Sequence, residues 1–103
     1  MSDEKGYPSF DWDPEKASLN FRKHGIRFEE AAFVFSDPLG VTIADTDHSI
    51  DEDRWITIGS FMEKILVVVF SYPDKLSESP IRLISARLAT VYEKKYYMEG
   101  VER

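Results

Sequence analysis

The sequence predicts an α+β domain with two N-terminal helices, a four-stranded, mainly antiparallel sheet and a C-terminal helix. Three observations predict this class. The chain has 103 residues, a length that supports one hydrophobic core. Helix signals occur near both ends, and runs of strand-forming residues follow one another between them. Because short or polar loops join these runs, we expect an antiparallel meander in a single domain over residues 10–103, after a loose leader at residues 1–9.

Residues 14–24 are expected to form the first helix. Asp13 is suited to cap the free amides of its first turn, and Pro14 loses no hydrogen bond at that position. Gly25 is suited to end the helix in the left-handed conformation. Polar side chains at helical spacing form one stripe along this helix, at Lys16, Asn20 and Lys23.

The remaining elements follow from hydrophobic patterning and capping signals. Residues 65–70 are apolar without interruption, which is typical of a central strand buried on both faces. Thr90 and Glu93 have the spacing of a capping box and begin a C-terminal helix that ends near Gly100. The other expected elements are a second helix at about residues 28–36, strands at residues 40–45, 55–60 and 81–87, and a small edge strand at residues 10–12.

The charge of the chain is unevenly distributed. Thirteen basic and nineteen acidic residues give a net charge of −6, which argues against a general polyanion binder. Residues 37–53 hold six acidic residues and no Lys or Arg, whereas residues 22–27 hold three basic residues and no acidic ones. Residues 82–95 hold four basic residues and one acidic residue. An anion-binding site is therefore predicted where the two basic segments meet, and ordinary solvated side chains are the alternative.

Several functional classes are excluded by composition. The chain has no cysteine, so it has no disulfide, thiolate nucleophile or cysteine-ligated zinc, and a reducing cytoplasm is expected. The longest apolar run, residues 65–70, is far shorter than the roughly 18 residues of a membrane span. We therefore expect no membrane partner. Neither a glycine-rich phosphate loop nor a G-x-S-x-G motif is present, and no cofactor is expected.

The chain has two histidines, His24 and His48. His48 lies in an acidic segment, but the spacing of that segment does not match a calcium loop, so no metal site is expected. His24 lies near the end of the first helix, where it is suited either to proton transfer or to capping and packing.

Cations near the ends of the expected strands and of the first helix suit phosphodiester cleavage without a metal. Arg54, Arg87 and Lys23 are such residues. Arginine or lysine stabilises the charge that develops on phosphorus, while a histidine or carboxylate moves the protons. RNA supplies its own nucleophile, the 2′-hydroxyl. Structural salt bridges are the alternative role for the same side chains.

Short motifs in a fixed order extend from residue 10 to about residue 100. They are Phe10-Asp11-Trp12-Asp13-Pro14-Glu15-Lys16, Asn20, Lys23-His24-Gly25, Phe28-Glu29-Glu30-Ala31, Phe35, Asp37-Pro38, Asp47-His48-Ser49, Glu52, Arg54, Ile58-Gly59, Ile84-Ser85-Ala86-Arg87, Ala89-Thr90 and Glu93. The ordered series resembles the BrnT family of toxins. Trp12 and Asn20 belong to it without carrying charge, and we expect core packing and helix placement from them.

The resemblance implies a ribonuclease toxin of a type II toxin–antitoxin module, with a fold similar to that of the RelE group. Such a toxin cuts RNA, arrests translation and is neutralised by a cognate, BrnA-like antitoxin with a DNA-binding domain. The complex represses its own operon, so operator DNA is contacted only through the antitoxin.

Carried over to this sequence, the resemblance implies six site residues: Lys23, His24, Arg54 and Arg87, with Glu52 and His48 in a second tier. The hypothesis is that Arg54 and Arg87 neutralise the scissile phosphate and that Lys23 binds a neighbouring phosphate. His24 or Glu52 then assists proton transfer. Anchoring of the loop and strand is the alternative role for the second-tier residues.

A non-catalytic binding module, or an inactive toxin homologue that acts only through antitoxin binding and operon autoregulation, is the competing hypothesis. A docking antitoxin segment would then bury Val91, Met98 and the tyrosines of the C-terminal helix. Tyr96 and Tyr97 are suited to stacking on bases, whereas a core stripe that contains Tyr92 and Tyr96 is the alternative.

Overall fold

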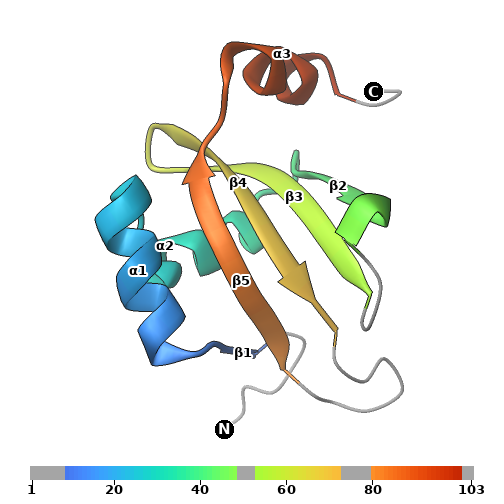
Figure 1. Cartoon of the computed structure of the whole chain (residues 1–103). Helices are drawn as coiled ribbons and strands as arrows, with labels where there is room; N and C mark the ends of the chain where they lie inside the picture. The colour runs from blue at the N-terminus through green and yellow to red at the C-terminus, as the bar shows by residue number, and fades with distance from the viewer. Residues whose placement is uncertain (1–8, 49–52, 73–79, 101–103) are drawn as a thin grey trace, which may run out of the picture.

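The computed structural model describes residues 9–48, 53–72 and 80–100. A five-stranded sheet forms its centre, with two helices packed on one face and a third helix at one end of the sheet (Figure 1). Along the chain the elements are β1 (Phe10–Asp11), α1 (Pro14–His24), α2 (Phe28–Ala32), the 3₁₀ helix η1 (Phe33–Ser36), β2 (Val41–Ala44), the 3₁₀ helix η2 (Thr46–His48), β3 (Arg54–Phe61), β4 (Lys64–Ser71), β5 (Ile81–Leu88) and α3 (Val91–Glu99).

The predicted α+β class is confirmed, but the predicted four-stranded sheet is wrong in detail. The strand order is β1-β5-β4-β3-β2, and β1 pairs in parallel with β5 through Phe10↔Ile81 and Asp11↔Arg82. The sheet is therefore five-stranded and mixed. The two residues of β1 are too few to show a hydrophobic pattern, so the sequence does not predict their pairing with β5, some seventy residues away. That pairing depends on how the intervening helices pack.

The signals predicted for α1 are confirmed. The Asp13 carboxylate accepts a hydrogen bond from the Glu15 N–H at 2.9 Å. Gly25 adopts a φ of 74°, and its N–H donates to the Phe21 carbonyl at 2.7 Å. The second expected helix is shorter than predicted, because α2 ends at Ala32 and the chain continues as η1.

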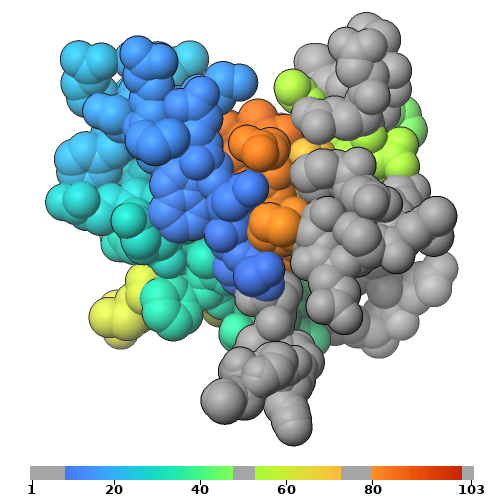
Figure 2. Space-filling model, turned by 90° about the horizontal axis from the view of Figure 1, so that it is seen from below, coloured from blue at the N-terminus to red at the C-terminus, as the bar shows by residue number. Residues whose placement is uncertain are grey.

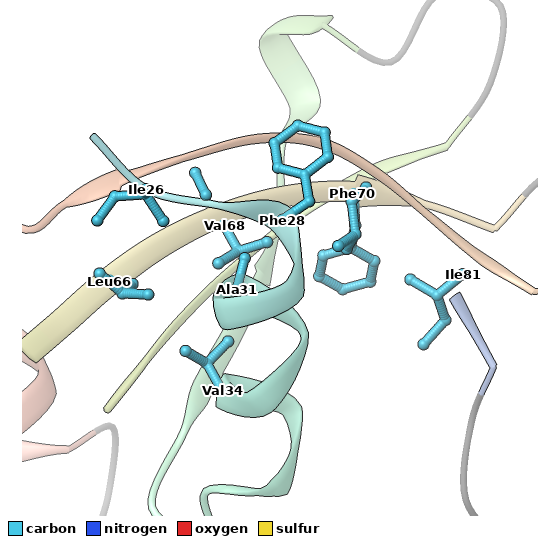
Figure 3. Packing of buried hydrophobic residues seen from close by; sticks show 10 residues of the cluster. Ile26, Phe28, Ala31, Val34, Leu66, Val68, Phe70 and Ile81 are labelled. Atoms are coloured by element: carbon cyan, nitrogen blue, oxygen red, sulfur yellow. The ribbon is translucent and has the colours of Figure 1, made fainter. Parts of the chain in front are cut away.

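The main core lies between the sheet and the helical segment that contains α2 and η1. Phe28, Ala31 and Val34 of that segment are buried against Leu66 and other alternate residues of β4 (Figure 3). The opposite face of β4 is also buried at one end, where Val67 belongs to a second cluster together with residues of β3 and α3. Burial on both faces confirms that β4 is the central strand.

Gly59 allows η1 to lie directly on β3. A Cβ atom at this position would lie 3.1 Å from both the Cβ and the carbonyl oxygen of Val34. Contacts this close would force η1 away from the sheet, so the approach requires glycine.

The C-terminal helix begins with the predicted capping box. The Thr90 hydroxyl accepts from the Glu93 N–H at 3.2 Å, and the Glu93 carboxylate accepts from the Thr90 N–H at 2.8 Å. The suggested core stripe is wrong, because Tyr92 is 85% exposed and Tyr96 is also exposed. Tyr97 is buried instead, so its ring is not available to stack on a base.

The leader expected at residues 1–9 lies outside the described residues except for Ser9, whose carbonyl accepts from the Ile81 N–H at 2.9 Å. Within the described part of the chain, no helix is long and apolar enough to cross a membrane.

Candidate functional site

An open pocket of about 210 Å³ lies between α1 and the edge of β5. The described residues that line it are Lys16, Leu19, Asn20, Lys23 and His24 from α1, with Ile84 and Ser85 from β5. In the space-filling view, the surface of β5 is visible beside the N-terminal segment of the domain (Figure 2). The pocket thus joins residues 23 and 24 of the first basic segment to residues 84 and 85 of the second, although no Lys or Arg of the second segment lines it.

Asn20 holds α1 against β5. Its Nδ2 donates to the Ala86 carbonyl at 2.9 Å, and its Oδ1 accepts from the Ala86 N–H at 3.0 Å. The same Nδ2 donates to the Ile26 carbonyl at 3.0 Å. β1 pairs only with the first two residues of β5, so the buried Asn20 amide occupies the place of a further strand at this edge. The expectation that Asn20 places the helix is confirmed.

Trp12 packs at the other end of the helical layer. Its ring meets Phe28 edge-on, with the centroids 5.8 Å apart, and it contacts the main core cluster. The expectation of core packing is confirmed.

The pocket is locally cationic. Lys16 and Lys23 are seven residues apart in α1, which corresponds to two turns and about 10.5 Å along the helix axis. His24 follows Lys23 and is half-buried. None of the described residues that line the pocket is acidic, although the whole chain carries a net charge of −6. Neutralisation of an anion is therefore possible here without interference from a lining carboxylate.

Arg87 lies on β5 two residues beyond Ser85 and is bound to α3. Its Nη1 and Nη2 atoms donate to the two carboxylate oxygens of Glu93, each at 2.8 Å, and Nη1 also donates to the Leu88 carbonyl at 3.2 Å. The hydrogen bonds from Arg87 lower the pKa of Glu93 from 4.5 to about 2. The same pairing raises the pKa of Arg87. The guanidinium is thus fixed at the α3 end of the sheet.

Arg54 lies at the opposite end of the sheet from Arg87. Arg54 pairs with Ser71 at the end of β4, whereas Arg87 pairs with Val67 of the same strand. Both arginines lie on the same sheet face, because Val67 and Ser71 are an even number of residues apart. Two strand spacings and four residues along the strand separate their Cα atoms by about 16 Å. The register therefore places the two arginines apart along this face, and their shared role at one phosphate stays a prediction.

The second-tier residues fall where the structure gives no geometry. Glu52 and the side chain of His48 lie outside the described residues, so their roles stay predictions. In the described part of the chain, no group of three or more His, Asp or Glu side chains is placed to hold a metal ion.

Sequence reasoning did not identify the pocket roles of Lys16, Leu19, Ile84 and Ser85. The stripe of Lys16, Asn20 and Lys23 was a visible signal, since three polar side chains at this spacing share one helix face. The opposing strand had no such signal, because helix–strand contact is decided by tertiary packing.

The fold and the pocket define a small α+β protein with a cationic site at the edge of its sheet. Residues 12–93 match the family described as "Ribonuclease toxin, BrnT, of type II toxin-antitoxin system". The match covers most of the chain, which therefore belongs to the BrnT family of ribonuclease toxins. Membership of a type II toxin–antitoxin family implies an antitoxin partner. No curated protein sequence matches the chain.

Proposed function

We propose that this protein is a cytoplasmic endoribonuclease that cleaves RNA at the pocket between α1 and β5 without a metal and arrests translation. A cognate, BrnA-like antitoxin with a DNA-binding domain neutralises it, and operator DNA is contacted only through that antitoxin. The observation that carries the proposal is the cluster of Lys16, Lys23 and His24 in a pocket without a lining carboxylate, on an otherwise acidic chain.

The pocket supplies what RNA cleavage by its own 2′-hydroxyl requires. His24 accepts the proton from the 2′-hydroxyl, whose oxygen bonds to phosphorus while the bond from phosphorus to the 5′ oxygen breaks. The leaving 5′ oxygen takes up a proton from solvent water, and His24 returns its proton to the solvent, so the products are a 2′,3′-cyclic phosphate and a 5′-hydroxyl. The Lys23 ammonium stabilises the charge on the non-bridging phosphate oxygens.

Arg87 and Arg54 serve different phosphates in this proposal. Arg87 follows Ser85 on β5, so it is near the pocket, and Glu93 holds its guanidinium in one orientation. Arg54 binds a phosphate further along the RNA, because about 16 Å separates its Cα atom from that of Arg87. His48 and Glu52 remain second-tier candidates.

The test is cleavage of labelled single-stranded RNA by the purified protein in EDTA. We expect cyclic-phosphate products from RNA and no cleavage of DNA of the same sequence, which lacks the 2′-hydroxyl. Lys23→Met and His24→Gln are each expected to slow cleavage by about 10²-fold or more. Arg22→Met, on the same helix but outside the pocket, is the matched control and is expected to cleave normally.

Two results would contradict the proposal. Cleavage that requires added Mg²⁺ would exclude the metal-free mechanism. Absence of cleavage by the folded protein, with or without Mg²⁺, would exclude the ribonuclease activity itself.

A second function, binding without catalysis, is favoured by exposed apolar side chains on α3. Val91 is 78% exposed, and Tyr92 and Met98 also face solvent. An antitoxin segment that folds on docking would bury these side chains. Under this alternative the wild-type protein binds its antitoxin without cleaving RNA, and Tyr92→Ala weakens the complex.

A further inference from the structure

The pocket between α1 and β5 has two apolar walls as well as its cations. Leu19 of α1 is 54% exposed, although it is a large aliphatic side chain. Ile84 of β5 lines the same pocket and is half-buried. Leu19 from α1 and Ile84 from β5 therefore border the pocket, and Lys16 and Lys23 of α1 lie beside them.

A β-bulge places Ile84 at this opening. The residues on either side of Ile84 pair with adjacent residues of β4, so Ile84 is the extra residue on β5. Bulges change the direction in which a side chain points, and they are common beside active sites.

The pocket is small. Its volume of about 210 Å³ is below the range of about 300–1,000 Å³ that is typical of pockets for drug-sized ligands. A flat ring with few substituents is a suitable occupant, because Leu19 and Ile84 provide apolar contact and the Ser85 hydroxyl provides one polar partner.

We propose that this pocket is a subsite for one unstacked base of single-stranded RNA, and that Lys16 binds the phosphate on the side of that base away from Lys23. The inference rests on the proposed ribonuclease function and adds to it the form of the substrate. A base in a duplex is stacked and paired, so it does not enter such a pocket without being extruded. The two lysines, about two helical turns apart, neutralise the backbone before and after the base.

The first experiment measures binding of an uncleavable 2′-O-methyl RNA oligonucleotide as a function of salt concentration. Each phosphate contact in a single strand contributes about 0.7 to the slope of log K against log salt. Lys16→Met is therefore expected to reduce the steepness of the slope by about 0.7. Arg22→Met is the matched control, because it removes a positive charge from the same helix outside the pocket and is expected to leave the slope unchanged.

The second experiment tests the base itself. We scan an abasic nucleotide through the oligonucleotide and expect one position at which wild-type affinity falls about fivefold. Leu19→Ser is expected to remove this sensitivity to the missing base. Leu39→Ser is the control, because Leu39 is similarly exposed at 51% but does not line the pocket. Circular dichroism establishes that each variant is folded, as we expect for substitutions at exposed positions.

The outcomes distinguish this inference from the function on which it rests. If the wild type cleaves RNA, yet Lys16→Met keeps the wild-type salt slope and no abasic position matters, the subsite is refuted while the ribonuclease function stands. If the folded wild type neither binds nor cleaves RNA, both are refuted. A slope change in Lys16→Met together with an abasic position that Leu19→Ser abolishes supports the subsite.

Discussion

The side-chain amide of Asn20 hydrogen-bonds both backbone groups of Ala86, at 2.9 and 3.0 Å, across 66 residues of sequence. This contact fixes the distance between α1 and β5, and with it the placement of Lys23 and His24 beside Ser85. The geometry of the candidate site therefore depends on a neutral residue that is itself buried.

Replacement of Asn20 by Ala is expected to destabilise the protein by about 2–4 kcal/mol. The reason is that three buried backbone groups, the Ile26 carbonyl and the carbonyl and N–H of Ala86, lose the hydrogen-bond partner that Asn20 provides. Urea unfolding of the variant measures this difference. Lys23→Met removes an exposed side chain from the same helix and is expected to change the free energy of unfolding by less than about 0.5 kcal/mol. Equal stability of the two variants would show that the Asn20 amide does not hold the helix.

Glu93→Gln is expected to remove part of the acid dependence of stability. The pKa of Glu93 is lowered from 4.5 to about 2 in the folded protein, so the ion pair with Arg87 stabilises the fold above about pH 4.5. That contribution is lost as the pH falls from 4.5 toward 2. The shift corresponds to at most about 3 kcal/mol, and partial exposure of both side chains reduces it to about 1–2 kcal/mol.

Urea unfolding of Glu93→Gln and wild type at pH 7 and pH 3 checks this prediction. Glutamine still supports the capping box, so the difference isolates the ion pair. Glu99→Gln, at an exposed position in the last turn of the same helix, is the control. A wild-type advantage that is the same at both pH values would contradict the assignment.

Tyr97→Phe is expected to destabilise the protein by about 1–2 kcal/mol at neutral pH, because the Tyr97 hydroxyl donates to the Asp37 carboxylate at 2.6 Å. Desolvation raises the pKa of Asp37, but hydrogen bonds from Tyr97 and from two backbone N–H groups together lower it below its usual value. The stabilisation is therefore present at neutral pH and falls as Asp37 is protonated in acid. Thermal unfolding of Tyr97→Phe beside Tyr92→Phe tests this, and the exposed Tyr92 should tolerate the change.

Met62→Gly is expected to stabilise the protein by about 0.5–1 kcal/mol. Met62 has a φ of 60° in the turn between β3 and β4, and among the described residues it is the one non-glycine residue with a positive φ. Its side chain is 76% exposed, so little packing is lost with it. Met98→Gly, at a 67% exposed position inside α3, is expected to change stability in the opposite direction by about 1 kcal/mol. Destabilisation by both substitutions would contradict the strain at Met62.

Arg54→Ala and Arg87→Ala are each expected to relieve the growth arrest caused by induction of the protein in a bacterial host, while antitoxin binding persists. The physical reason is loss of phosphate neutralisation by two half-buried arginines on the sheet face that packs against α3. Growth curves and co-purification with the antitoxin from the same operon provide the two measurements. If both variants, produced at the wild-type level, remain fully toxic, these arginines are not part of the site.

Short-range signals predicted most of the elements correctly. The α1 cap at Asp13, its left-handed end at Gly25 and the Thr90–Glu93 capping box depend on residues within four positions of one another, so the local sequence contains the full interaction. The candidate site was less accessible. The charge pattern predicted an anion-binding site wherever the two basic segments meet, but it did not predict that Arg87 pairs with Glu93 or that Arg54 lies at the other end of the sheet.

The sequence alone determined the α+β class, the order of the main elements and the membership implied by its motifs, because hydrophobic period and capping are local properties. The tertiary structure decided the parallel pairing of β1 with β5, the buried face of α3 and the position of Arg54 relative to Arg87. Helix α3 carries aromatic residues on several sides, so its sequence does not select the buried one. The contact between Tyr97 and Asp37 selects the buried residue, because the Tyr97 hydroxyl requires a hydrogen-bond partner when it is buried.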